Sequence, residues 1–541
     1  MTSSQKKLFL SWTILFAIFL LFFGLSSRDL WDPDEARYAE IAREMIESGD
    51  YISPHLNYEA YNKKPPLYFW LSAIAFNLTG MADYAPRYVT TLFGAGLLYL
   101  VFALGKKFFC FETGLLSLII LLTSIEFIAL SHSIVTDMTL AFFITLSVFS
   151  FINTTGKYSP YSTIHRIILF ISLGLGFMSK GPLGIIVPGI IIFFYILIFK
   201  EFESIKVFFQ PTGILIALLV ILPWYIVSSI KTPGFLYENI VYENIMRYFT
   251  DVHERSGSIV YYIPVIIGGF FPWIFFLPFQ ATKSISNQTE DSRQLKFLIA
   301  WVCAIFVFYS LSKSKLPNYI LPIYPPLAMI AGKCWKDCFH PREDKGITFG
   351  VYAIFALFLS FDISVLIILK FFPNIVIIVL DAIGLTALIW TLISLNIWFI
   401  ILVFLTYKNK KVAIFYMQVF FVVFIFLGAV INVDAFEKFK SNKKLALTLK
   451  SSAIGKSEVV FFKFFKPSFV FYSQRRILRI DYKFQLTYRL YQTNNNYDEY
   501  YIFRKKDFDR DLVELIQPKL VKVGENRECI IMRRREPEKK T

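Results

Sequence analysis

Carboxylates and cations in short polar segments between long apolar runs are the residues of this sequence best placed to do chemistry. The segment WDPDEARYAEIAREM, residues 31–45, is the densest of these. Asp34, Arg37 and Tyr38 have the spacing of neighbours on one helix face. An ionised carboxylate is favoured near a helix N-terminus, which suits Asp34. Such a face is either a solvated surface or part of a functional site.

The ends of this helix are marked in the sequence. Asp32 is a favourable N-cap, Pro33 suits the first turn, and Glu35 stands three residues after Asp32, as in a capping box. Gly49 favours the end of a helix. We therefore predict a short, capped helix directly after the first apolar run.

Three further polar segments follow along the chain. NKKPPLYFW contains Lys63 and Lys64, SHSIVTDMTLAFF contains Asp137, and GFMSKGPLG contains Lys180. Asp137 interrupts an apolar stretch, and burying an acid at that depth is costly enough to suggest a role.

Polar residues also gather near two later turns. Each basic residue there, taken alone, is typical of a membrane-interface anchor. Together they place cations on the face where the positive-inside rule expects few, which predicts a site for anionic groups such as phosphates. The segments MRYFTDVHERSG and SKSKLPNYILPIYPP contribute Arg247, His253, Arg255, Lys313, Lys315 and Tyr319.

The elements that must position these residues are membrane-spanning helices. The chain has 541 residues, of which 56% are hydrophobic and 60 are phenylalanines, and its mean hydropathy is +0.54. Apolar runs of about 20 residues recur, each long enough to cross a bilayer. We predict a polytopic α-helical membrane protein. No small-residue cleavage site follows residues 8–25, so this run is predicted as a span and not as a removable signal peptide.

About thirteen spans are predicted, and their short lysine-rich loops place the N-terminus in the cytoplasm. The odd number then places the C-terminus on the outer side. Residues 65–80 have too short an apolar part to cross, which predicts an interfacial or re-entrant helix, and the run 375–384 is also too short. The predicted spans are 8–25, 85–105, 113–131, 138–153, 166–179, 182–199, 211–229, 259–279, 297–312, 316–333, 347–370, 385–406 and 412–432.

Composition also limits the classes of function. The net charge of +16 comes mainly from lysines and arginines in short loops between apolar runs, which argues against nucleic-acid binding. The sequence contains no Gly-rich phosphate loop of the Walker or Rossmann kind. We expect no structural disulfide among the five cysteines, and we interpret Cys334 and Cys338 as unconnected loop thiols.

Two domains are predicted. Residues 1–435 form a transmembrane domain with a first outer loop at 26–84 and a second at 230–258. Residues 436–541 contain the short β-like runs VVFFKFF, SFVFYSQ, RILRI, YYIFRKK and ECIIMRR, which are typical of a small α/β domain. The final RRREPEKKT is predicted as a disordered tail.

Five segments, in this order, carry a resemblance to a known family. WDPDEARYAEIAREM, KKPPLYFWL, TDMTLAFF, SKGPLG and SKLPNYILPIYPPLA resemble segments of the polyprenyl-phosphate-sugar glycosyltransferases with the GT-C fold. The group they resemble most is the 4-amino-4-deoxy-L-arabinose lipid A transferase family, which is related to protein O-mannosyltransferases. The resemblance covers essentially the whole chain. It implies thirteen spans, a periplasmic C-terminal α/β domain and a location in the bacterial inner membrane.

The resemblance also implies roles for individual residues. Asp34 matches an essential first-loop aspartate and Asp137 matches a second important aspartate, so both are predicted as catalytic. Arg37, Lys64 and Lys180 are predicted to bind the phosphate of the donor. The other predicted substrate contacts are Glu35, Tyr38, His253, Lys313, Lys315 and Tyr319.

One departure from the family pattern concerns metal binding. Relatives often carry an acid immediately before the position of Lys64. In a relative that acid can bind a metal together with a histidine, for which the resemblance implies His253 as the match here. Lysine stands at position 63 here. We therefore expect no metal at this site, zinc included, and no other cofactor.

The activity implied by the resemblance is an inverting transfer of a sugar, such as 4-amino-4-deoxy-L-arabinose, from undecaprenyl phosphate to an envelope acceptor. A lipid A phosphate is the leading acceptor, because a basic outer face suits a phosphorylated lipid, and a protein hydroxyl is the alternative. A flippase for lipid-linked sugars is a second class, but it would place its charges near the midplane. We expect a monomer that acts among membrane lipids.

Overall fold

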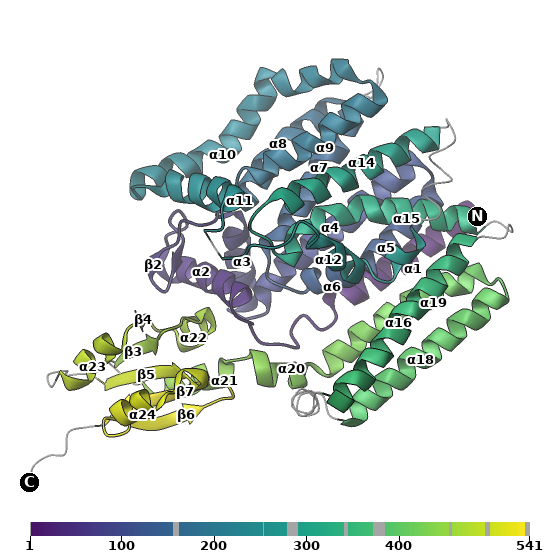
Figure 1. Ribbon diagram of the computed structural model, residues 1–541. Coiled ribbons are helices and arrows are strands. Elements are labelled where there is room, and N and C mark those ends of the chain that lie inside the picture. Colours follow the sequence, from purple (N-terminus) through teal and green to yellow (C-terminus); the bar gives the residue numbers. More distant parts are fainter. Residues whose placement is uncertain are drawn as a thin grey trace, which may run out of the picture. The chain divides into compact units, whose positions relative to one another are not determined.

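The computed structural model describes residues 2–154, 162–252, 254–277, 290–339, 345–371, 385–453, 457–492 and 498–535 (Figure 1). His253, the apolar run 375–384 and residues 536–541 of the predicted tail lie outside these ranges. By its contacts the chain divides into two units. The membrane unit comprises residues 1–25, 62–68 and 87–431, and the C-terminal unit comprises residues 26–61, 69–86 and 432–541.

The membrane unit is a helical bundle, which confirms the predicted multi-pass membrane fold. Among the residues that the structure describes, eight helices are long and apolar enough to span a bilayer, or nine if one bent pair counts as a span. Shorter apolar segments are α9 (Leu183–Phe199), the part Ile393–Tyr407 of α18 (Leu385–Tyr407) and, at the predicted interfacial segment, α3 (Leu67–Thr79). The total of thirteen spans stays a prediction. The eight helices are α1 (Ser3–Phe22), α4 (Ala85–Phe108), α7 (Thr136–Thr154), α8 (Ser162–Lys180), α10 (Pro211–Lys231), α14 (Glu290–Leu311), α16 (Lys345–Phe371) and α19 (Lys411–Ile431).

Three segments predicted as continuous helices are broken. The segment 113–131 consists of α5 (Phe111–Leu122) and α6 (Ile125–Ser131), which meet at an angle of 68°. The segment 259–279 contains α12 (Tyr262–Gly269) and a short 3₁₀ turn, η3 (Trp273–Phe276). The segment 316–333 begins as the 3₁₀ helix η4 (Pro317–Ile323) before α15 (Tyr324–Cys338). Prolines that lack an N–H explain the last two breaks.

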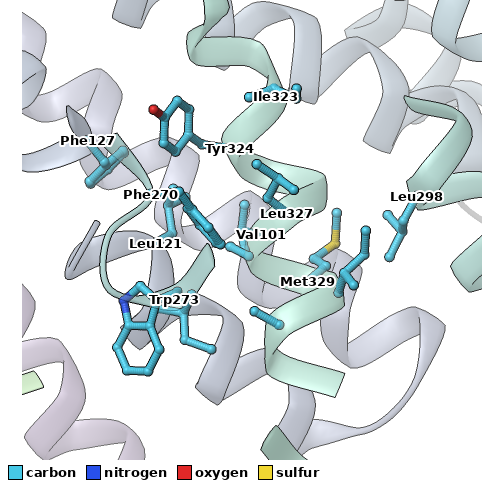
Figure 2. Close-up of a cluster of buried hydrophobic side chains, with 14 of the residues drawn as sticks. Val101, Leu121, Phe127, Phe270, Trp273, Leu298, Ile323, Tyr324, Leu327 and Met329 are labelled. Atoms are coloured by element: carbon cyan, nitrogen blue, oxygen red, sulfur yellow. The ribbon is translucent and has the colours of Figure 1, made fainter. Parts of the chain in front are cut away.

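A buried aromatic and aliphatic core fixes these breaks in place (Figure 2). Trp273 is fully buried, and its indole N–H donates to the backbone oxygen of Thr123 at 3.2 Å, at the bend between α5 and α6. Its ring lies edge-on to that of Trp335 in α15, with 6.2 Å between centroids. Trp273 therefore joins the break at η3 to the bend between α5 and α6 and to helix α15.

The C-terminal unit contains a small α/β domain, as predicted. Its five-stranded sheet has the order β4-β3-β5-β7-β6, with β3 parallel to β4 and β5, and β7 antiparallel to β5 and β6. The run SFVFYSQ, predicted as β-like, is instead the helix α22, because Pro467 favours a first helical turn. The strands are β3 (Ser457–Phe462), β4 (Ile477–Ile480), β5 (Asp498–Arg504), β6 (Leu520–Glu525) and β7 (Cys529–Arg534), and the helices are α20 (Val433–Lys440), α21 (Lys443–Ser452), α22 (Pro467–Ser473), α23 (Lys483–Tyr491) and α24 (Arg510–Ile516).

The first outer loop packs with this domain. It contains helix α2 (Asp34–Ser48), a hairpin of β1 (His55–Leu56) and β2 (Glu59–Ala60), and most of α3. The sequence places residues 26–84 with the transmembrane domain, whereas the contacts of 26–61 and 69–86 group them with residues 432–541.

Both ends of α2 were predicted, with different outcomes. Gly49 ends the helix with a φ of +71°, a conformation that glycine adopts without strain, which confirms its role. The predicted Asp32 cap is wrong. The helix starts after Pro33 with no side-chain cap, because the Asp32 carboxylate is engaged by residues far along the chain.

Candidate functional site

A pocket in the membrane unit collects three of the chain's cations. It encloses about 460 Å³, part of which is open to the outside. Lys64, Lys180 and Arg247 line it together with one acid, Glu243. The other lining residues are Leu183, Asn244, Tyr248, Phe308, Tyr309, Ser312, Ser314 and Tyr319. An excess of positive charge in a pocket with aromatic walls suits an anionic group that carries apolar parts.

Lys180 is held at the wall of this pocket by Asp137. Its ammonium forms a buried ion pair with one carboxylate oxygen of Asp137, and the amide of Asn318 donates to the other. The same ammonium lies 4.2 Å from the ring centroid of Tyr319. A side chain held by an anion and an aromatic face has a fixed direction.

The backbone explains how these groups meet. Asp137 lies in the first turn of α7, where a carboxylate is favoured, and Lys180 is the last residue of α8. Gly181 turns the chain with a φ of +70°, so that α9 begins at Leu183. A Cβ at position 181 would lie 3.1 Å from the side chain of Asn244, so glycine also lets the second outer loop approach.

Arg247 is held from two sides. It ends the π-helical segment η2 (Tyr237–Met246), pairs with Glu243 at 2.9 Å and donates to the hydroxyl of Tyr319. The start of η2 also fixes the segment before Lys64, because Asn239 donates to the backbone oxygen of Asn62 at 2.8 Å.

Lys64 lies in the same pocket. Burial and, to a lesser extent, the nearby cations Arg247 and Lys180 lower the pKa of its ammonium to about 7, while Glu243 and Asp137 act in the opposite direction. An anion bound among these cations offsets their mutual repulsion and keeps Lys64 protonated. The pocket is therefore electrostatically suited to take up a phosphate.

The other predicted residues of the first loop lie in the C-terminal unit. Asp34 is partly exposed at the start of α2 and pairs with Arg37 at 3.1 Å. Glu35 is buried and accepts two hydrogen bonds from Arg28, at 2.5 and 2.7 Å. Tyr38 is buried against Phe69, with 5.7 Å between ring centroids. Glu35 and Tyr38 therefore hold the helix, while Asp34 keeps an accessible carboxylate.

Two predicted lysines are placed differently from the pocket cations. Lys315 is buried, and its ammonium donates to the backbone oxygens of Ser310 and Ser312, so it fixes the turn. Lys313 is exposed and is not among the residues that line the pocket.

Glu243 and Asn318 are not predicted as site residues, and Arg247 is predicted only as one of the cations that suit an anionic group, without a role of its own. Glu243 lies in the π-helical segment η2 and Arg247 directly follows it, and the charge of both in a long outer loop is the signal that the sequence offers. Asn318 lies in the motif SKLPNYILPIYPPLA, directly before the predicted Tyr319.

Side chains of His, Cys, Asp and Glu form no group of three or more that could hold a metal ion within the described ranges.

Comparison with known proteins gives the chain a family context. A model of the dolichyl-phosphate-mannose-protein mannosyltransferase family matches residues 7–237. Two relatives, named undecaprenyl phosphate-alpha-4-amino-4-deoxy-L-arabinose arabinosyl transferase and the same with the number 2, are 32% identical to the chain over the matched residues. The protein of Serratia proteamaculans matches over 63% of this chain and 62% of its own length, and one from Proteus mirabilis over 65% and 64%. The match thus spans less than two thirds of the length of these relatives.

A solved structure shares the whole fold. The crystal structure of ArnT from Cupriavidus metallidurans bound to undecaprenyl phosphate aligns with a TM-score of 0.80 over 97% of both chains, at 20% sequence identity.

Proposed function

We propose, on the premise of the confirmed resemblance to the polyprenyl-phosphate-sugar glycosyltransferases of the GT-C fold, that this chain is an inverting glycosyltransferase. The donor is a sugar, such as 4-amino-4-deoxy-L-arabinose, on undecaprenyl phosphate, and the acceptor is a phosphate of lipid A. The observation that carries the proposal is the pocket that joins Lys64, Lys180 and Arg247 beside aromatic side chains. The names of the relatives support the choice of donor.

The pocket cations stabilise the leaving group. As the bond between the anomeric carbon and the phosphate oxygen breaks, its electron pair stays on that oxygen, and the prenyl phosphate gains negative charge. Lys64 and Arg247 meet this charge, with Lys180 directed by Asp137. Preorganised charges of this kind are usually the largest single contribution to catalysis. In this proposal Asp137 acts by positioning Lys180.

Asp34 supplies the accessible carboxylate. A phosphate acceptor is already a nucleophile near neutral pH, so Asp34 then orients it or stabilises the positive charge that develops on the sugar. A hydroxyl acceptor needs Asp34 as general base. In both cases a new bond forms between the acceptor oxygen and the anomeric carbon on the face opposite the leaving phosphate. No metal or other cofactor takes part in this scheme.

The site is proposed to lie at the periplasmic face of the bacterial inner membrane, with the N-terminus in the cytoplasm, and the protein is proposed to act as a monomer. A reporter fused after residue 440 tests this topology, because it reads as periplasmic if the span number is odd.

Lys64 gives the reaction a characteristic pH dependence. A lysine with a pKa of about 7 is charged below that pH and neutral above it, so donor capture weakens as the pH rises through 7. We expect kcat/KM for the donor to fall above pH 7. The variant Lys64→Arg stays charged and loses this limb of the profile, whereas Lys63→Arg, its exposed neighbour, retains it. A limb that persists unchanged in Lys64→Arg rules out Lys64 as its source.

A protein O-glycosyltransferase is the second candidate, favoured by the match of residues 7–237 to the protein mannosyltransferase family. Mass spectrometry of lipid A and of envelope proteins, from cells with and without the gene, separates the two. The proposal predicts lipid A that loses its amino sugar when the gene is removed. An unchanged lipid A profile beside altered glycoproteins supports the second candidate.

A further inference from the structure

The residues directly before helix α2 are bound to the C-terminal α/β domain. The backbone N–H of Leu30 donates to the hydroxyl of Tyr472 at 2.9 Å. The indole N–H of Trp31 donates to a carboxylate oxygen of Glu437, also at 2.9 Å. The chain that enters α2 is therefore fixed by partners more than 400 positions away in the sequence.

Asp32 makes the most extensive of these contacts. Its Oδ1 accepts from the backbone N–H of Ser468 at 2.9 Å. Its Oδ2 accepts from the side-chain amide of Asn442 at 3.1 Å and from the hydroxyl of Ser468. A carboxylate that accepts three hydrogen bonds is fixed in position and in orientation, and such charge-assisted bonds are stronger than neutral ones.

The rest of the loop is held by the same domain. Asn57 forms a reciprocal pair with the backbone of Ile477, as its amide donates to Ile477 O at 2.8 Å and its oxygen accepts from Ile477 N at 2.7 Å. Phe76 of α3 stacks on Phe471 of α22, with 6.0 Å between ring centroids. The body of α2 also packs on α22. The loop thus has contacts to the domain before and after α2, so the helix has little freedom to shift alone.

We propose that the C-terminal domain positions helix α2 for the transfer reaction, and that Asp32, Ser468 and Asn442 are the positioning residues. Asp32 stands two residues before Asp34, so a shift of one carboxylate moves the other. This inference rests on the proposed function, in which Asp34 takes part in the transfer. It explains why Asp32 does not cap its own helix. The carboxylate is used to join α2 to the domain.

The test uses the full-length protein in lipid nanodiscs. Asp32→Ala removes all three hydrogen bonds, and Asp32→Asn keeps an oxygen that can accept from Ser468 N. Asp481→Ala removes an exposed carboxylate of the same unit, paired with Arg479, and serves as the control. Two quantities are measured for each variant: hydrogen exchange of the peptide 34–48, and kcat with KM for the donor.

We expect Asp32→Ala to speed the exchange of residues 34–48 and to lower kcat by about 10- to 100-fold, because small misplacements of a catalytic group cost rates of this size. KM for the donor stays within about twofold, since the variant leaves the pocket cations in place. Asp32→Asn recovers part of kcat, and Asp481→Ala behaves as the wild type. Unchanged exchange of strand β3 shows that the domain remains folded.

Two outcomes overturn the inference. One is unchanged exchange of residues 34–48 in Asp32→Ala, which shows that the contact does not hold the helix. The other is faster exchange with an unchanged kcat, which shows that the position of α2 does not matter for the transfer. Failure of the proposed function itself gives a different result, since the wild type then transfers no sugar. If only the role of Asp34 is wrong, Asp34→Asn transfers sugar as fast as the wild type.

Discussion

Replacing Asp34 with asparagine is expected to lower the transfer rate by about 100- to 10,000-fold while the protein stays folded. Asparagine has the shape of aspartate but neither its charge nor its basicity, so it cannot stabilise positive charge on the sugar or accept a proton. Folding is affected little, because Asp34 is partly exposed and its pair with Arg37 is of a kind that contributes about 0–1 kcal/mol. Initial rates with saturating donor, together with the melting temperature, measure both effects.

Glu47→Gln is the matched control for this change. Glu47 is a half-exposed carboxylate near the other end of α2 and pairs with Arg43. It is expected to transfer sugar at the wild-type rate. Full activity of Asp34→Asn, or an equal loss in Glu47→Gln, removes Asp34 from its proposed role.

The second large effect is expected for Lys64→Met. Methionine keeps much of the apolar length of the side chain but removes the cation, so the leaving phosphate loses one of the charges that stabilise it. We expect kcat/KM for the donor to fall by about 100- to 1,000-fold, the cost typical of removing one such group. Binding of undecaprenyl phosphate, the carrier that remains after the sugar has been transferred, weakens in parallel.

Lys63→Met is the control, because it removes an equal charge from an exposed neighbouring position that does not line the pocket. It is expected to change kcat/KM by less than about threefold, since exposed charges interact weakly through water. Equal losses in the two variants point to a general effect of basic charge near the membrane and contradict a specific site.

Much of the site was predictable because it depends on motifs that are short in sequence. Lys64, Lys180 and Tyr319 were selected from three separate segments, and they line one pocket. Glu243 is not predicted, and Arg247 is predicted only as one of several cations, because a charged pair in a long loop is typical of any solvated segment. The contact of Arg247 with Tyr319 and its place in the pocket distinguish it from a solvated residue.

The errors have a common physical cause. Asp32 has every local feature of an N-cap, yet its partners Ser468 and Asn442 lie more than 400 residues away and make three hydrogen bonds with it. Such tertiary contacts override the local propensity of a residue wherever they are stronger than its local interactions. The same holds for SFVFYSQ, whose aromatic residues suit a strand but are buried in helix α22.

Two of the three helix breaks have a signal in the sequence, and the third has none. Pro272, Pro317 and Pro322 mark places where a straight helix cannot continue, and the structure bends or tightens at each of them. The bend between α5 and α6 has no proline. It is held by the contact of Trp273 with Thr123, which sequence spacing alone does not reveal.

The central claim is that this chain moves a sugar from a polyprenyl phosphate to a phosphate of lipid A. The most direct test gives the purified protein a radiolabelled undecaprenyl-phosphate sugar together with lipid A and an unfolded peptide rich in serine and threonine. We predict label on lipid A, none on the peptide, and loss of transfer in Lys64→Met. Label on the peptide alone, or transfer to lipid A that is unaffected by Lys64→Met, contradicts the account.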